Sequence, residues 1–143
     1  MKKLVLFAGD IALLYGALAL MVFVRYREQF QFQFNLHLVP FSIVFLIWII
    51  VFYILNLYEP RTLRNNLGFY TSLLQAVITA GALSVLFFYL FPVEGITPKT
   101  NLALFVLFFG MIEAGARSLF NRVIEKRFQR NVVIVGLNPQ SIE

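Results

Sequence analysis

The sequence predicts an all-α membrane protein built as a bundle of four transmembrane helices. Two runs, residues 29–58 and 65–93, contain no charged side chain. About 20 mostly apolar residues suffice for a helix to cross the hydrocarbon core of a bilayer. The composition agrees, because 60% of the 143 residues are hydrophobic and 13% are charged, against about 25% charged in an average soluble domain.

The basic balance of the chain favours lipid over nucleic acid as a partner. The net charge is +5, but the basic residues lie between apolar runs and do not form a polar face of their own. Anionic lipid headgroups are the partner that fits this pattern. The chain has no cysteine, which excludes a disulfide framework and a thiolate metal site.

The first two predicted spans cover about residues 4–24 and 41–57. The first contains one acid, Asp10, and the second follows Pro40. Proline is favoured in the first turn of a helix, where its missing N–H is not needed. We therefore expect the second helix to begin at about Pro40.

The third and fourth predicted spans cover about residues 73–91 and 102–116. The third ends at Pro92, and the fourth has Glu113 near its end. All four spans are expected to be α-helical, because lipid cannot satisfy the hydrogen bonds of an open backbone.

The positions of lysine and arginine predict the orientation of the bundle. With an even number of spans, both termini and the loop 58–68 lie on one side of the membrane. That side carries nine of the 12 basic residues and the other side carries three, Arg25, Arg27 and Lys99. We therefore expect both termini to be cytoplasmic.

The first external loop, residues 29–38, alternates glutamine and phenylalanine before it reaches His37. A period of two is typical of an extended, half-buried segment. We expect an interfacial segment whose Phe side chains enter the headgroup zone, with a short strand or lid as the alternative. His37 has no second metal-ligating residue near it in the sequence, so it is not expected to bind a metal.

The character of the chain changes after the fourth span. Residues 117–128 show helical spacing of apolar and charged side chains, so we expect the fourth helix to continue into the cytoplasm. Residues 131–136 form a short β-branched run that ends in glycine, typical of a buried parallel strand. We therefore divide the chain into a membrane domain, 1–130, and the start of a truncated Rossmann-like α/β domain, 131–143.

A few ionisable residues fall near the cytoplasmic ends of the predicted spans, where such groups are candidates for function. Asp10 lies about 9 Å past the start of the first span. Glu113 and Arg117 are four residues apart, so they share one helix face. We predict a buried polar cluster of Asp10, Glu113 and Arg117, with Arg64 as a further member. The cluster would fix helix register, or it would hold the diphosphate end of a lipid carrier through arginine.

Small residues also recur at four-residue spacing in the fourth span, at Gly110, Ala114 and Ser118. Such a row lets two helix backbones approach closely. We expect it to serve packing within the chain, with the seam of a homo-oligomer as the alternative.

Four features occur together in one order: Asp10 in the first span, Pro40 before the second, Asn56-Leu57-Tyr58-Glu59-Pro60-Arg61 after it, and Arg130-Asn-Val-Val-Ile-Val-Gly136 after the fourth. This order resembles the amino-terminal membrane domain of the large bacterial sugar transferases, the polyprenyl-phosphate hexose-1-phosphate transferases. The resemblance implies a bacterial inner-membrane location and a cytoplasmic Rossmann-like domain. It also implies a catalytic domain farther on, which moves a sugar phosphate from a nucleotide sugar to a polyprenyl-phosphate carrier with Mg²⁺.

This function would start the synthesis of capsule, exopolysaccharide or O-antigen, with the present segment as a membrane anchor that holds no catalytic, cofactor or metal residue. Membrane anchors of nucleotide-sugar dehydratases resemble the same region. Their dinucleotide fingerprint would be G-x-G-x-x-G, whereas this turn has Asn138 and Ser141 at the second and third glycine positions. A small four-helix transporter and a plain scaffold are further alternatives.

Overall fold

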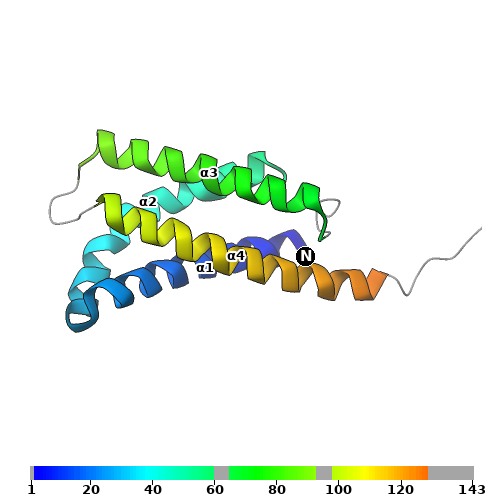
Figure 1. Cartoon of the computed structure of the whole chain (residues 1–143), viewed down its shortest axis with the longest axis horizontal. Coiled ribbons are helices and arrows are strands. Elements are labelled where there is room, and N and C mark those ends of the chain that lie inside the picture. The colour runs from blue at the N-terminus through cyan, green and yellow to red at the C-terminus, as the bar shows by residue number, and fades with distance from the viewer. Residues whose placement is uncertain (1, 60–64, 93–97, 129–143) are drawn as a thin grey trace, which may run out of the picture.

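The computed structural model describes residues 2–59, 65–92 and 98–128, and within these ranges all regular structure is helical (Figure 1). There are four α-helices and one 3₁₀ turn: α1 (Lys2–Tyr26), η1 (Arg27–Gln29), α2 (Phe30–Ile54), α3 (Leu67–Leu90) and α4 (Pro98–Phe128). The predicted strand 131–136, and with it the domain 131–143, lies outside the described residues.

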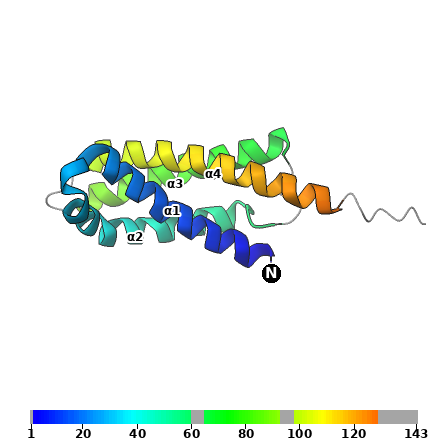
Figure 2. The ribbon, with the colours of Figure 1, turned by 90° about the horizontal axis from the view of Figure 1, so that it is seen from below.

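Three stretches are long and apolar enough to cross a membrane: Lys3–Ile54, Leu67–Leu90 and Lys99–Val123. The first has 52 residues and contains both α1 and α2, which η1 separates. A single straight helix of that length would be roughly 78 Å long, far beyond a hydrocarbon core of about 30 Å. The chain reverses at η1 instead, and α1 packs against α2 (Figure 2).

The predicted start of the second helix is wrong by ten residues or so, because α2 begins at Phe30 and carries Pro40 in its interior. The strand or lid that we gave as the alternative for residues 29–38 is also wrong, because residues 30–38 belong to α2. A residue type that recurs at every second position also recurs at every fourth, which is the helical spacing i, i+4. At this spacing the rings of Phe30 and Phe34 stack with centroids 5.6 Å apart. Phe32, on the opposite side of the helix, is 68% exposed.

The four α-helices alternate in direction and form a ring (Figures 1 and 2). α1 packs against α2 and α4, and α3 packs against the same two helices. The start of α1 lies at the same end of the bundle as the end of α4, which projects beyond the other helices there. The turn at η1 and the start of α4 lie at the opposite end.

One row of α4 residues at four-residue spacing runs through the centre of the bundle. Every member is 0–2% exposed: Asn101, Phe105, Phe109, Glu113, Arg117 and Asn121. Rows of this kind are the ridges that pack into the grooves of neighbouring helices. The row is aromatic in its middle and polar at both ends, which is the order of polarity across a bilayer.

The aromatic middle of that row packs on α2. Phe41, Phe45, Trp48 and Phe52 follow each other at helical spacing and are buried. The Trp48 ring meets Phe109 edge to face, with centroids 4.8 Å apart. Its indole Nε1 donates to Ser84 Oγ on α3 at 3.0 Å. Trp48 is thus a packing residue that joins α2 to both α3 and α4.

A polar group closes the bundle at the end opposite the start of α1. His37 is fully buried and lies within α2, so it does not belong to the loop that the sequence predicted. Its Nδ1 donates to the Gln33 carbonyl at 2.7 Å, and its Nε2 accepts from the Asn101 amide. Asn101 also bonds the Tyr26 hydroxyl, so that α1, α2 and α4 are joined at this end.

The row of small residues on α4 faces α3. A Cβ placed on Gly110 would lie 3.7 Å from a methyl group of Val77. Ser118 Oγ is 2.7 Å from the Tyr70 hydroxyl. Gly110 and Ser118 therefore serve packing within the chain, as we expected for this row.

Candidate functional site

Arg117 is the centre of a buried polar cluster at the end of the bundle where α1 begins. The residue is 2% exposed. Its Nε donates to Glu113 Oε1, one helical turn earlier on α4, at 2.7 Å. Its Nη2 donates to Asp10 Oδ2 on α1 at 2.6 Å. Three of the four side chains that the sequence predicted to cluster are thus in contact, and the fourth, Arg64, lies outside the described residues.

The third nitrogen of Arg117 reaches the turn that follows α2. Nη1 donates to the Leu57 carbonyl at 2.8 Å. This carbonyl is in place because α2 ends in a Schellman motif, in which Leu57 N–H donates to the Phe52 carbonyl and Asn56 N–H to the Tyr53 carbonyl. The motif needs a left-handed residue, and Asn56 supplies it with φ 56°. Asparagine tolerates this conformation better than most residues.

Tyr58 covers one face of the guanidinium. The Arg117 carbon Cζ lies 5.3 Å from the centre of the Tyr58 ring, within the range of a cation–π contact. The Tyr58 hydroxyl is buried beside the Asp10 carboxylate. Burial, and then the charge of nearby Asp10, raises the pKa of this hydroxyl, so Tyr58 stays neutral at physiological pH.

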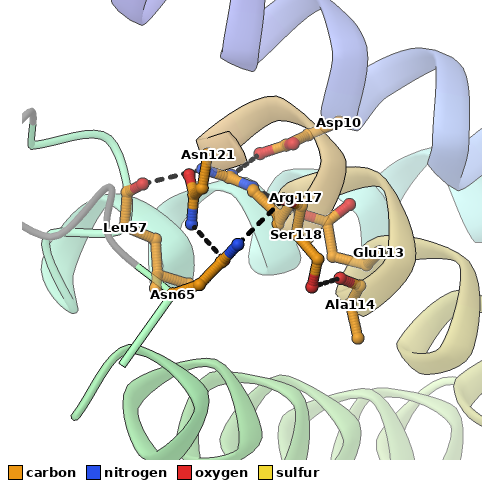
Figure 3. Close-up of polar contacts among 8 residues, drawn as sticks. All are labelled: Asp10, Leu57, Asn65, Glu113, Ala114, Arg117, Ser118 and Asn121. Carbon is orange, nitrogen blue, oxygen red and sulfur yellow. Dashed lines mark hydrogen bonds and ion pairs between the residues drawn. The ribbon is translucent and has the colours of Figure 1, made fainter. Parts of the chain in front are cut away.

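Amide side chains extend the cluster toward α3 (Figure 3). Asn65 donates to the Ser118 carbonyl at 3.0 Å and accepts from Asn121 at 3.1 Å. The next residue, Asn66, caps α3 by accepting from Phe69 N–H at 2.8 Å. The described residues on either side of the gap between α2 and α3 are thus both bonded to α4. Leu57 is bonded through Arg117, and Asn65 through Ser118 and Asn121.

An ion pair on the surface fixes the same segment to α1. Lys3 Nζ lies 2.6 Å from Glu59 Oε1, and both side chains are about half exposed, at 57% and 45%. Exposed pairs of this kind contribute little to stability, about 0–1 kcal/mol. The Lys3–Glu59 pair therefore adds little to the stability of this end of the bundle.

The geometry favours a structural role for the cluster over phosphate binding. All three guanidinium nitrogens of Arg117 already donate to protein oxygens, and two carboxylates surround this one cation. A phosphate would have to displace Asp10 or Glu113 and would then face the displaced carboxylate. Asn121 Oδ1 is buried without a partner among the described residues, and an acceptor atom such as this one repels an anion.

Sequence reasoning missed the residues that complete the cluster. Tyr58 and Leu57 stood in the sequence motif after the second span, but nothing in that motif linked them to Arg117. Asn121 lies four residues after Arg117, on the same face of α4, and this spacing was the one signal that could have included it.

Comparison of the chain with protein-family models, with curated proteins and with solved structures gave no match. The fold and the contacts define the chain as a helical protein whose helices are long and apolar enough to span a membrane.

Proposed function

We propose that this chain is the membrane module of a bacterial polyprenyl-phosphate hexose-1-phosphate transferase. In this proposal the four α-helices cross the inner membrane, with the start of α1 and the end of α4 on the cytoplasmic side. The module anchors a catalytic region whose substrates are a nucleotide sugar and a lipid-carrier phosphate.

One observation carries this proposal. Two of the features on which the resemblance depends, Asp10 and the segment Asn56-Leu57-Tyr58, lie far apart in the sequence but converge on Arg117. The motif after α2 supplies a left-handed residue, a carbonyl acceptor and an aromatic ring to the same guanidinium. These residues therefore act as one unit, which supports the view that their order in the sequence is a family feature.

The arrangement of the helices supports the orientation. The positive-inside rule assigns the side with nine basic residues to the cytoplasm. Lys3 and Arg122 are exposed at or near the end of the bundle where α1 begins, while Arg27 and Lys99 are exposed at the other end. A catalytic region that follows α4 would then face the cytoplasm, where nucleotide sugars are made.

The module contributes to the reaction by position. A domain that is held at the membrane meets a membrane-bound lipid carrier at a raised effective concentration. Mg²⁺ and the catalytic residues would belong to that domain, and the segment described here carries out no chemical step.

A transfer assay tests this proposal. Membranes from cells that express the full-length gene product are incubated with Mg²⁺ and a nucleotide sugar labelled with ³²P in its β-phosphate. The sugar 1-phosphate carries this phosphorus to the carrier and the nucleoside monophosphate leaves, so the label should enter the organic extract. A dehydratase would leave the label in the water-soluble nucleotide sugar, and that result would contradict the proposal.

Two arginine variants of α4 separate anchoring from chemistry. Arg117→Met should lower the transfer activity in proportion to the loss of membrane-inserted protein, since Arg117 holds the bundle together. Arg122→Met, the control, removes an exposed arginine of the same helix and should leave both quantities unchanged. Full insertion of Arg117→Met combined with lost activity would show that the module takes part in the chemistry.

A further inference from the structure

An apolar groove lies between α3 and α4 at the end of the bundle where α4 begins. Its volume is about 580 Å³. One wall is a face of α3 from Val77 to Tyr89, and the other is the first part of α4, from Lys99 to Val106. The groove is open where side chains are small, at Gly81, Ala82 and Ala103.

The groove changes from apolar to charged along its length. Among residues 2–59, 65–92 and 98–128, Lys99 is the only charged residue that lines the groove, and it forms no ion pair within those ranges. Tyr89, 82% exposed, stands at the same level on α3, and tyrosine is enriched at membrane interfaces. The apolar part covers about three turns of α3, roughly 18 Å from Val77 to Tyr89.

We propose that this groove binds one anionic phospholipid, with an acyl chain along α3 and α4 and the headgroup phosphate against Lys99. The polarity of the groove matches such a molecule in both parts, since a long apolar channel ends at Lys99, a cation without an ion-pair partner among the described residues. The ammonium group attracts a phosphate there by about 1 kcal/mol. The site is independent of the transferase proposal and lies at the other end of the bundle from the Arg117 cluster.

A second copy of the chain fits the groove less well. A two-fold axis along the membrane normal would place two hollow faces against each other and would bring both Lys99 side chains to the same depth of one seam. The facing hollows would leave voids, which lose packing contacts. The two Lys99 side chains would place like charges side by side.

Native mass spectrometry of the full-length protein tests the proposal. The protein is released from nanodiscs of mixed phosphatidylglycerol and phosphatidylethanolamine, and the bound lipid is identified by mass. Wild type should retain one phosphatidylglycerol. Ala103→Phe should abolish this peak because the ring fills the groove, and Lys99→Gln should lower the preference for phosphatidylglycerol about fivefold.

Matched variants show whether the effects belong to the groove. Ala12→Phe adds the same ring to an exposed position of α1, and Arg27→Gln removes an exposed charge at the same end of the bundle. Both should retain the lipid as wild type does, and Lys99→Arg should keep the preference. Equal retention by Ala103→Phe and wild type would overturn the proposal. Recovery of a polyprenyl phosphate in place of the phospholipid, or of a dimer that Ala103→Phe dissociates, would also overturn it.

Discussion

At the scale of single residues, Arg117 is the side chain that links distant parts of the chain at one end of the bundle. It is buried in a segment apolar enough to cross a membrane, and it joins α1, α4 and the turn after α2. An ionised group in such a place is tolerated only with partners. Because each partner comes from a different part of the chain, the cluster fixes the register of these elements.

The cluster holds two acids and one base, and this imbalance predicts which substitution destabilises the fold more. Arg117→Met leaves two buried carboxylates without a counter-charge and should lower the free energy of unfolding by about 3–5 kcal/mol. Asp10→Asn keeps an acceptor for Arg117 and leaves one acid facing one base, so its cost should be smaller, about 1–3 kcal/mol. Reversible unfolding of the purified protein in mixed micelles measures both values, and a larger loss for Asp10→Asn would contradict this view of the cluster.

The sequence was sufficient to predict part of this cluster. Asp10, Glu113 and Arg117 are ionisable groups within apolar spans, and the cost of burying them unpaired already requires that they meet. The Leu57 carbonyl could not be predicted in this way, because every residue has a carbonyl and only the turn geometry selects this one. The role of Tyr58 depends on the same turn.

At the scale of elements, the end of α2 positions the cluster. The Schellman motif at Asn56 reverses the chain and presents Leu57 O to Arg117. A residue with a Cβ is strained in the left-handed region, and asparagine and glycine are the residues that visit it routinely. The side chain at this one position therefore controls how well the turn forms.

Two substitutions at Asn56 test this role. Asn56→Ala should lower the free energy of unfolding by about 1–2 kcal/mol, the cost of the left-handed conformation for an ordinary residue. Asn56→Gly keeps the conformation accessible and should cost less than Asn56→Ala. The same unfolding measurement compares them, and an equal or larger loss for the glycine variant would exclude backbone strain as the reason for asparagine here.

The contact between α2 and α3 gives a second test at this scale. Ser84→Ala leaves the buried Trp48 Nε1 without its acceptor, which should cost about 1–3 kcal/mol. Trp48→Phe removes the donor together with part of the ring. In the double variant the two losses should be less than additive, and full additivity in this double-mutant cycle would show that the bond contributes nothing.

The sequence predicted the existence of the helices better than their boundaries. The start of α2 was placed about ten residues too late, because a proline and an alternating pattern both indicated a break. In the structure Pro40 lies inside the helix. Proline has no N–H to donate to the preceding turn, and a proline of this kind is tolerated in membrane helices that pack against neighbours. The alternating Phe residues also satisfy helical spacing, so that periodicity alone could not decide between the two structures.

At the scale of the whole molecule, the bundle is polar at both ends and aromatic in the middle. The Arg117 cluster lies at one end, and the group of His37, Asn101 and Tyr26 at the other. Aromatic side chains of α2 and α4 fill the space between them. This order of polarity matches that of a bilayer, which is apolar in its middle and polar at both faces.

The central proposal is that the chain crosses the membrane four times, with the start of α1 and the end of α4 in the cytoplasm. Since the chain has no cysteine, single cysteines can report their own location through labelling by a membrane-impermeant maleimide. In spheroplasts, Arg27→Cys and Lys99→Cys should be labelled, while Lys3→Cys and Arg122→Cys should react only after the membrane is opened. Labelling of Lys3→Cys and Arg122→Cys on opposite faces of the membrane would contradict the proposal.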